Sequence, residues 1–75
     1  MELQKLINLF DEVLNRDGNE VINAETNFKE CEHWDSLSAF TISESIYDKW
    51  NVKLRGLQIR KCTTIKELFD LISSN

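Results

Sequence analysis

The side chains that could do chemistry lie close together in the middle of the chain. Cys31 and His33 form the only close pair of a nucleophile and a base, and Asp35 and Ser36 follow directly. A spacing of two residues does not aim a thiol and an imidazole at one another, and no obvious acid orients the histidine. The pair also lacks the further ligands that a structural zinc site needs. We therefore expect neither a catalytic site nor a metal site here.

Ser36 has a clearer setting, because it stands at the predicted start of a helix over residues 36–50. Asp is a preferred N-cap residue, whose carboxylate can accept from the unpaired amides of the first turn. With Asp35 as the cap, Ser36 is the first helical residue. The predicted apolar face consists of Ala39, Ile42, Ile46, Tyr47 and Trp50, with Phe40 at its edge. The predicted polar face consists of Ser38, Thr41, Glu44, Ser45 and Asp48, with Leu37 in the same sector.

Two further helices are predicted from their apolar periodicity. Residues 2–15 carry one stripe made of Leu3, Leu6, Ile7, Phe10, Val13 and Leu14. Asp17-Gly18-Asn19 favours a turn after that helix. Thr64 and Glu67 have capping-box spacing and begin a last helix. Its apolar face consists of Ile65, Leu68, Phe69 and Ile72.

The segments between these helices have weaker patterns. From Glu20 to Trp34 there is no periodicity, yet Val21, Ile22 and Phe28 are too apolar for a solvated linker. We expect a long loop pinned to the core. Residues 51–54 form a connector, and one short helical turn after Gly56 is anchored by Leu57, Ile59 and Cys62. Three main helices and one short helix predict an all-α four-helix bundle.

Length and composition exclude several classes of protein. Seventy-five residues make one domain over residues 1–75, with a small core. A formal net charge of −4 opposes nucleic-acid binding, and a single His with no Gly-rich phosphate loop argues against an enzyme. No stretch reaches membrane-spanning length, and we expect a soluble, cytoplasmic monomer with reduced cysteines. A basic stretch, which we interpret as solvated surface, contains Lys49, Lys53, Arg55, Arg60 and Lys61.

At Trp34-Asp35-Ser36-Leu37 the chain resembles the acyl carrier protein family, whose signature is Asp-Ser-Leu at the start of the second helix. The resemblance continues through Trp50, Val52 and Leu54, then Thr63-Thr64-Ile65 and the last apolar helix. The first helix, the long loop and Phe28 also fit, so the resemblance covers nearly the whole chain. It implies the small four-helix bundle of the acyl carrier type.

This resemblance implies a non-catalytic carrier with a 4'-phosphopantetheine arm on Ser36, flanked by Asp35 and Leu37. A phosphopantetheinyl transferase would attach the arm from coenzyme A. A loading ligase or acyltransferase and downstream biosynthetic enzymes would be the other partners. The implied partner-binding row consists of Leu37, Thr41, Glu44 and Asp48, and the implied cargo cavity of Phe28, Ile46, Leu54, Ile59 and Cys62. These five could equally be plain core, because so small a bundle needs its apolar residues for packing.

Two departures from the family pattern bear on the pathway. Glu32-His33 stands where fatty-acid carriers typically have Leu-Gly, and Thr41 replaces a usual acid. We therefore expect an acyl carrier of a dedicated pathway, with fatty acid or polyketide biosynthesis as the wider setting. An aminoacyl, D-alanyl or peptidyl carrier remains an alternative. A helical interaction domain that kept the fold and lost the modification is another.

Overall fold

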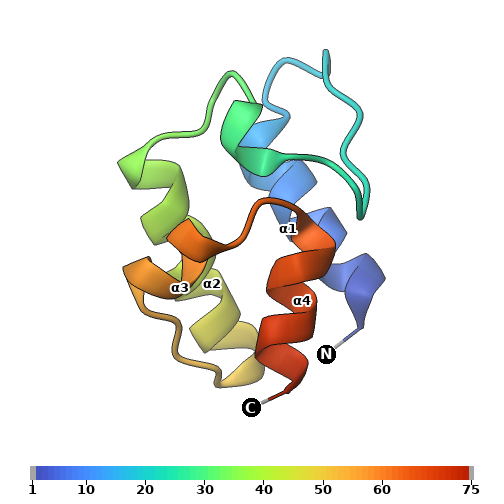
Figure 1. The fold of residues 1–75 in the computed structure, drawn as a ribbon. Helices are drawn as coiled ribbons and strands as arrows, with labels where there is room; N and C mark the ends of the chain where they lie inside the picture. The colour runs from blue at the N-terminus through green and yellow to red at the C-terminus, as the bar shows by residue number, and fades with distance from the viewer. Residues whose placement is uncertain (1, 75) are drawn as a thin grey trace.

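The computed structural model describes residues 2–74, which form an all-α bundle (Figure 1). Its helices are α1 (Leu3–Leu14), the 3₁₀ helix η1 (Phe28–Glu30), α2 (Ser36–Trp50), α3 (Gly56–Lys61) and α4 (Ile65–Ser73). α1 packs against both α2 and α4, and the short α3 packs against α2. The predicted fold of three main helices and one short helix is confirmed. None of the helices within these residues is long and apolar enough to cross a bilayer.

α1 and α4 supply the most regular apolar faces of the core. Leu6, Phe10 and Leu14 follow one another at four-residue spacing in α1, so they lie on one face, and all three are fully buried. The buried face of α4 consists of Ile65, Leu68 and Ile72. Full burial of each such side chain contributes about 1.5–3 kcal/mol. Because the total stability of a domain is only about 5–15 kcal/mol, these two faces decide whether the chain folds.

The loop between α1 and α2 is pinned to the core through Phe28, as predicted. The Phe28 side chain is fully buried, and its ring centroid lies 5.1 Å from that of Phe10 and 4.8 Å from that of Trp34. The prediction for Val21 was wrong, since that side chain is 83% exposed. The turn after α1 contains Gly18 at φ 70°, in the left-handed region that glycine adopts without steric cost.

Backbone hydrogen bonds tie the same loop to the start of α4. Asn27 and Thr64 form an isolated antiparallel bridge. The Phe28 amide donates to the Thr63 carbonyl at 3.2 Å, and the Lys66 amide donates to the Ala24 carbonyl at 3.0 Å. These contacts join segments that are far apart in the sequence, so the loop is part of the folded unit and not a solvated linker.

α2 has a different rotation about its axis from the predicted one. Ser38, predicted on the polar face, is fully buried with Ile42 and Ile46. Phe40 and Tyr47, predicted at or on the apolar face, are 61% and 52% exposed. The rotation is stabilised by a hydrogen bond in which Ser38 Oγ donates to the His33 carbonyl at 2.6 Å, which satisfies the hydroxyl inside the protein.

α3 also presents one predicted anchor to solvent. Ile59 and Cys62 are buried as expected, but Leu57 is 63% exposed, so its predicted role as an anchor was wrong. Before α3, Asn51 ends α2 in the left-handed conformation with φ 56°, and Leu54 returns the chain to the core. Asn tolerates this conformation better than most residues with a Cβ.

The start of α4 has the predicted capping box. Thr64 Oγ1 accepts from the Glu67 amide, and Glu67 Oε1 accepts from the Thr64 amide at 2.9 Å and from the Thr63 amide at 2.7 Å. The Thr64 and Thr63 amides hold the pKa of the Glu67 carboxyl below its usual value. The carboxylate therefore stays charged at the positive end of the helix dipole.

Candidate functional site

Ser36 is exposed and is the first residue of α2, as predicted. Asp35 caps the helix, because its Oδ1 accepts from the Ser38 amide at 2.7 Å. This backbone hydrogen bond is the main cause of the lowered pKa of the Asp35 carboxyl. The Asp35 carboxylate is thus charged and already accepts a hydrogen bond from the helix. The Ser36 hydroxyl lies on the surface beside it, at the positive end of α2.

The three residues before Ser36 are held by the body of the protein. The ring of Trp34 packs against buried Phe28, and the Trp34 amide donates to the Cys31 carbonyl at 3.1 Å. The His33 carbonyl accepts from Ser38 Oγ. Ser36 therefore sits on a fixed segment, although its own side chain is free to be reached from solvent.

A cleft of about 620 Å³ opens beside Ser36, between α2 and α3. Its walls are formed by Trp34, Asp35, Ser36, Ala39, Phe40, Ser43, Glu44, Leu54, Gly56, Ile59 and Arg60. The apolar side chains of the cleft lie beside serine hydroxyls, carboxylates and a guanidinium group. The cleft can therefore shield the apolar part of a bound ligand and offer hydrogen bonds to its polar part. α3 lies beside α2 (Figure 1), and its residues Gly56, Ile59 and Arg60 contribute to the cleft walls.

The five residues predicted to line a cargo cavity are all buried and belong to one core cluster. Leu54 and Ile59 reach the cleft beside Ser36. Phe28, Ile46 and Cys62 belong to the packed core and do not line it. Burial raises the pKa of the Cys62 thiol, with the Glu67 carboxylate adding to the effect, so this side chain behaves as a small apolar residue.

The row predicted to meet partners is on the surface. Leu37, Thr41, Glu44 and Asp48 are all exposed along α2. Sequence reasoning missed Phe40 and Tyr47 as exposed neighbours of this row, and it missed Ser43 and Arg60 in the cleft walls. A smaller hollow of about 280 Å³ continues along the same side and is lined by Ser43, Glu44, Tyr47, Lys53 and Leu54. For Phe40, Ser43 and Tyr47 the only signal was helical spacing from Ser36, and it needed the correct rotation of α2. Arg60 lies on α3, so no spacing within α2 could indicate it.

Cys31 and His33 do not face each other as a nucleophile and a base. Cys31 is buried, and burial, followed by the Glu20 carboxylate, raises its thiol pKa to about 11. His33 Nε2 instead lies 3.0 Å from Asp17 Oδ2, a partner in the turn after α1 that sequence spacing could not indicate. The donor atoms of Asp17, Glu32 and His33 all lie within 4.8 Å of one another. This proximity was not anticipated, and we interpret it as a hydrogen bond between His33 and Asp17 that fixes the loop.

Comparison with protein families agrees with this geometry. A family model described as "Phosphopantetheine attachment site" matches residues 4–72, nearly the whole chain. The chain belongs to the phosphopantetheine carrier family. Neither a curated protein nor a solved structure matches it. A carrier of this kind is not itself a catalyst, and it holds a 4'-phosphopantetheine group for its partner enzymes.

The surroundings of the exposed hydroxyl at the start of α2 fit such a group. The first amides of a helix have no partners within it, and together with the helix dipole they favour a phosphate. The cleft that begins at Ser36 gives the rest of the arm a partly apolar wall to lie against. The group, when bound, supplies the carrier with a terminal thiol for thioester formation.

Proposed function

We propose that the chain is an acyl carrier of a dedicated biosynthetic pathway, with the phosphopantetheine arm on Ser36. One observation carries this proposal: the serine of Asp35-Ser36-Leu37 is exposed at the first position of α2 and opens directly onto the cleft. Ser38, two residues later, is buried with its hydroxyl already bonded to His33, so it is a poor acceptor for the arm.

The neighbouring residues have distinct roles in this proposal. Asp35 fixes the start of α2 and so holds Ser36 in one position. Leu37 is 67% exposed and offers a transferase or loading enzyme an apolar contact beside the serine. Thr41, Glu44 and Asp48 extend this surface along α2. A phosphopantetheinyl transferase, a loading ligase or acyltransferase and the downstream enzymes would use it in turn.

The composition of the cleft supports a short or polar cargo over a long fatty chain. Leu54 and Ile59 fill the inner side, while Ser43, Glu44 and Arg60 put polar groups on the walls. Burying polar walls under a hydrocarbon chain would leave their hydrogen bonds unmade, which is unfavourable. An aminoacyl or peptidyl cargo would also satisfy these groups. The proposal therefore includes an aminoacyl or peptidyl carrier as the alternative, and the choice between the two depends on the enzyme that loads the cargo.

The attachment site is tested by incubating the protein with coenzyme A and a promiscuous phosphopantetheinyl transferase and measuring intact mass. The wild type and Ser43→Ala, a matched serine in the same cleft, should both gain the mass of one phosphopantetheine group. Ser36→Ala should gain none. A wild type that stays unmodified would favour the helical interaction domain that lost its modification, and a modified Ser36→Ala would place the arm elsewhere.

The cargo class is tested by thermal melts of the loaded carrier with acyl groups of increasing length. Each methylene that becomes buried stabilises the loaded state by about 0.8 kcal/mol. We expect the midpoint to level off at short chains, because the inner side of the cleft is already filled by Leu54 and Ile59. A midpoint that keeps rising into long chains would indicate a roomy interior and a general fatty-acid carrier.

A further inference from the structure

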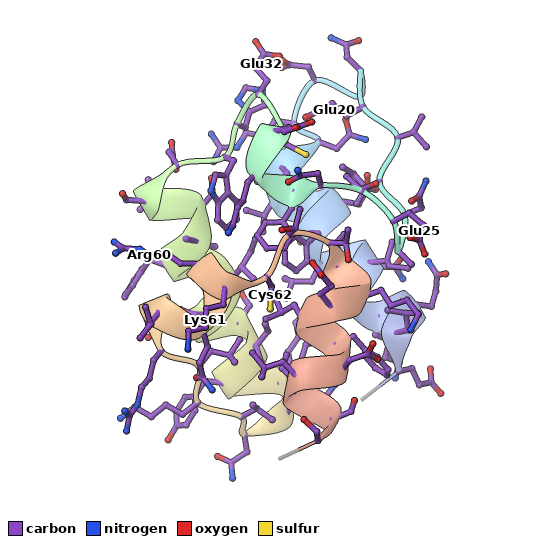
Figure 2. All side chains as sticks on the ribbon, viewed as in Figure 1. Glu20, Glu25, Glu32, Arg60, Lys61 and Cys62 are labelled. Carbon is purple, nitrogen blue, oxygen red and sulfur yellow. The ribbon has the colours of Figure 1, made fainter. Side chains whose placement is uncertain are left out.

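The charges of this chain are separated along its sequence and in space. Six of the nine Lys and Arg residues lie between Asp48 and Glu67, and no acid lies among them. Although the net charge of the chain is −4, the segment around α3 is strongly basic. Figure 2 shows Arg60 and Lys61 on α3 at one side of the molecule, while Glu20, Glu25 and Glu32 lie on the long loop between α1 and α2, at the top and the opposite side of the view. A solvated surface without function gives no reason for this separation.

α3 presents an exposed leucine together with two of these cations. Leu57, Arg60 and Lys61 stand at positions i, i+3 and i+4, so they share one face of the helix, and all three are exposed. We refer to these three residues as the basic α3 face. Ile59 points the opposite way and is buried, which fixes the orientation of this short helix.

The cations of this face are not used within the part of the chain that the structure describes. Among residues 2–74, the carboxylates that contact a basic side chain are Asp17, which pairs with His33, and Asp70, which pairs with Lys66. Lys29 approaches α3, but it donates to the Arg60 carbonyl and adds a further positive charge. Arg60 and Lys61 therefore present their full charge to an approaching molecule.

The basic α3 face borders the cleft that contains Ser36. Gly56 and Arg60 form one wall of that cleft, and Ser36 and Glu44 belong to the other. An enzyme that docks on the protein at Ser36 itself, as a transferase must, therefore also comes close to α3. The wall at α2 carries Asp35 and Glu44 and the wall at α3 carries Arg60, so the two walls of the cleft have opposite charge.

We propose that the basic α3 face is a docking surface for a partner enzyme that sets acidic side chains around an apolar pocket. The pocket receives Leu57, and the carboxylates meet Arg60 and Lys61. This inference rests on the proposed carrier function, and it adds the chemistry of the partner. Complementary charge of this kind selects partners, because a like charge in the same place costs affinity. A uniformly basic enzyme surface is disfavoured, because it would meet like charge at α3.

The test uses the holo protein and two designed peptides. Both peptides are helices with leucines along one face, and the flanking positions are glutamates in one and lysines in the other. Binding is followed at low salt by amide chemical-shift changes in the ¹⁵N-labelled protein. The variants are Lys61→Glu, Leu57→Ala and the control Lys5→Glu, which makes the same change in net charge on an exposed position of α1.

The glutamate peptide should shift amides of residues 53–61 and bind better than the lysine peptide. Lys61→Glu and Leu57→Ala should each weaken it by about tenfold, whereas Lys5→Glu should change it by less than about twofold. Circular dichroism should show the helicity of all three variants unchanged, because the substituted side chains are exposed.

Several results would overturn the docking proposal. They are an absence of glutamate-peptide binding, equal weakening by Lys61→Glu and Lys5→Glu, and a preference for the lysine peptide. Binding to vesicles of anionic phospholipid that is stronger than peptide binding and lost in Lys61→Glu would assign the face to a lipid surface instead. Failure of the carrier function is seen separately, as a missing mass gain in the modification step. In that case the peptide titration is run on the unmodified protein.

Discussion

Replacing Ser38 by alanine tests how the segment before Ser36 is held. The substitution removes the 2.6 Å hydrogen bond from Ser38 Oγ to the His33 carbonyl, which water reaches only in part. A net hydrogen bond contributes about 0.5–1.5 kcal/mol, and a carbonyl left unsatisfied adds to the loss. The better helix propensity of alanine recovers a few tenths of a kcal/mol. We therefore expect Ser38→Ala to lower the free energy of unfolding by about 1–2 kcal/mol.

For a domain of this size, each kcal/mol corresponds to about 4–8 °C in Tm, so the midpoint should fall by roughly 4–16 °C. The matched control is Ser43→Ala, a serine of the same helix whose hydroxyl donates to the Phe40 carbonyl in an exposed bond of 3.0 Å. Its Tm should stay within about 4 °C of the wild type, because substitutions at exposed sites rarely exceed about 0.5 kcal/mol. Equal midpoints for the two variants, measured by circular dichroism, would refute the role assigned to the buried hydroxyl.

Three further outcomes follow from the site and its charges. Leu37→Ala and Glu44→Lys should slow processing by partner enzymes while leaving the melting curve unchanged, since both side chains are exposed; loss of helicity in either would contradict the observed rotation of α2. Cys31 should react with a disulfide reagent only slowly below pH 9, because its raised pKa of about 11 keeps the thiol protonated; fast labelling of the native protein would show that the site opens. The lowered pKa values of Asp35 and Glu67 contribute stability above the usual carboxyl range, which is lost as pH falls through their folded-state values. An acid titration of Asp35→Asn and Glu67→Gln should therefore show a smaller loss of Tm than the wild type, and an identical loss would contradict this.

The fold could be predicted from the sequence because its main helices have clear apolar periodicity or clear capping residues. α1 has buried leucines and a phenylalanine at helical spacing, and α4 begins with a complete capping box. The start of α2 was predicted for the same kind of reason, since Asp35 is a favourable cap with a local partner in the Ser38 amide. In each case the decisive interactions lie within one turn of the helix. Periodicity and capping rules describe that range well.

The features that the sequence predicted wrongly or missed depend on contacts between different segments of the chain. α2 has apolar side chains around much of its circumference, and the rotation that buries Ser38 depends on the His33 carbonyl outside the helix. α3 has only six residues, too few for a period to show that Leu57 is exposed while Ile59 is buried. The pairing of His33 with Asp17 depends on the path of the loop. The walls of the cleft depend on the rotation of α2 and on the orientation of α3, so the serine could be predicted but its surroundings could not.

The hydrogen bonds between the loop and the start of α4 also bear on when the carrier becomes competent during its synthesis. Trp34 beside Ser36 rests on Phe28, and the loop around Phe28 is tied to Thr63 and Lys66. Ribosomes add roughly 5–20 residues per second, so Ser36 emerges before the residues that secure its surroundings. We expect a chain stalled before Thr63 leaves the ribosome to be a poor substrate for the transferase. Residues that are synthesised well after Ser36 would then control its modification, and a partly made chain would not receive an arm that it cannot use.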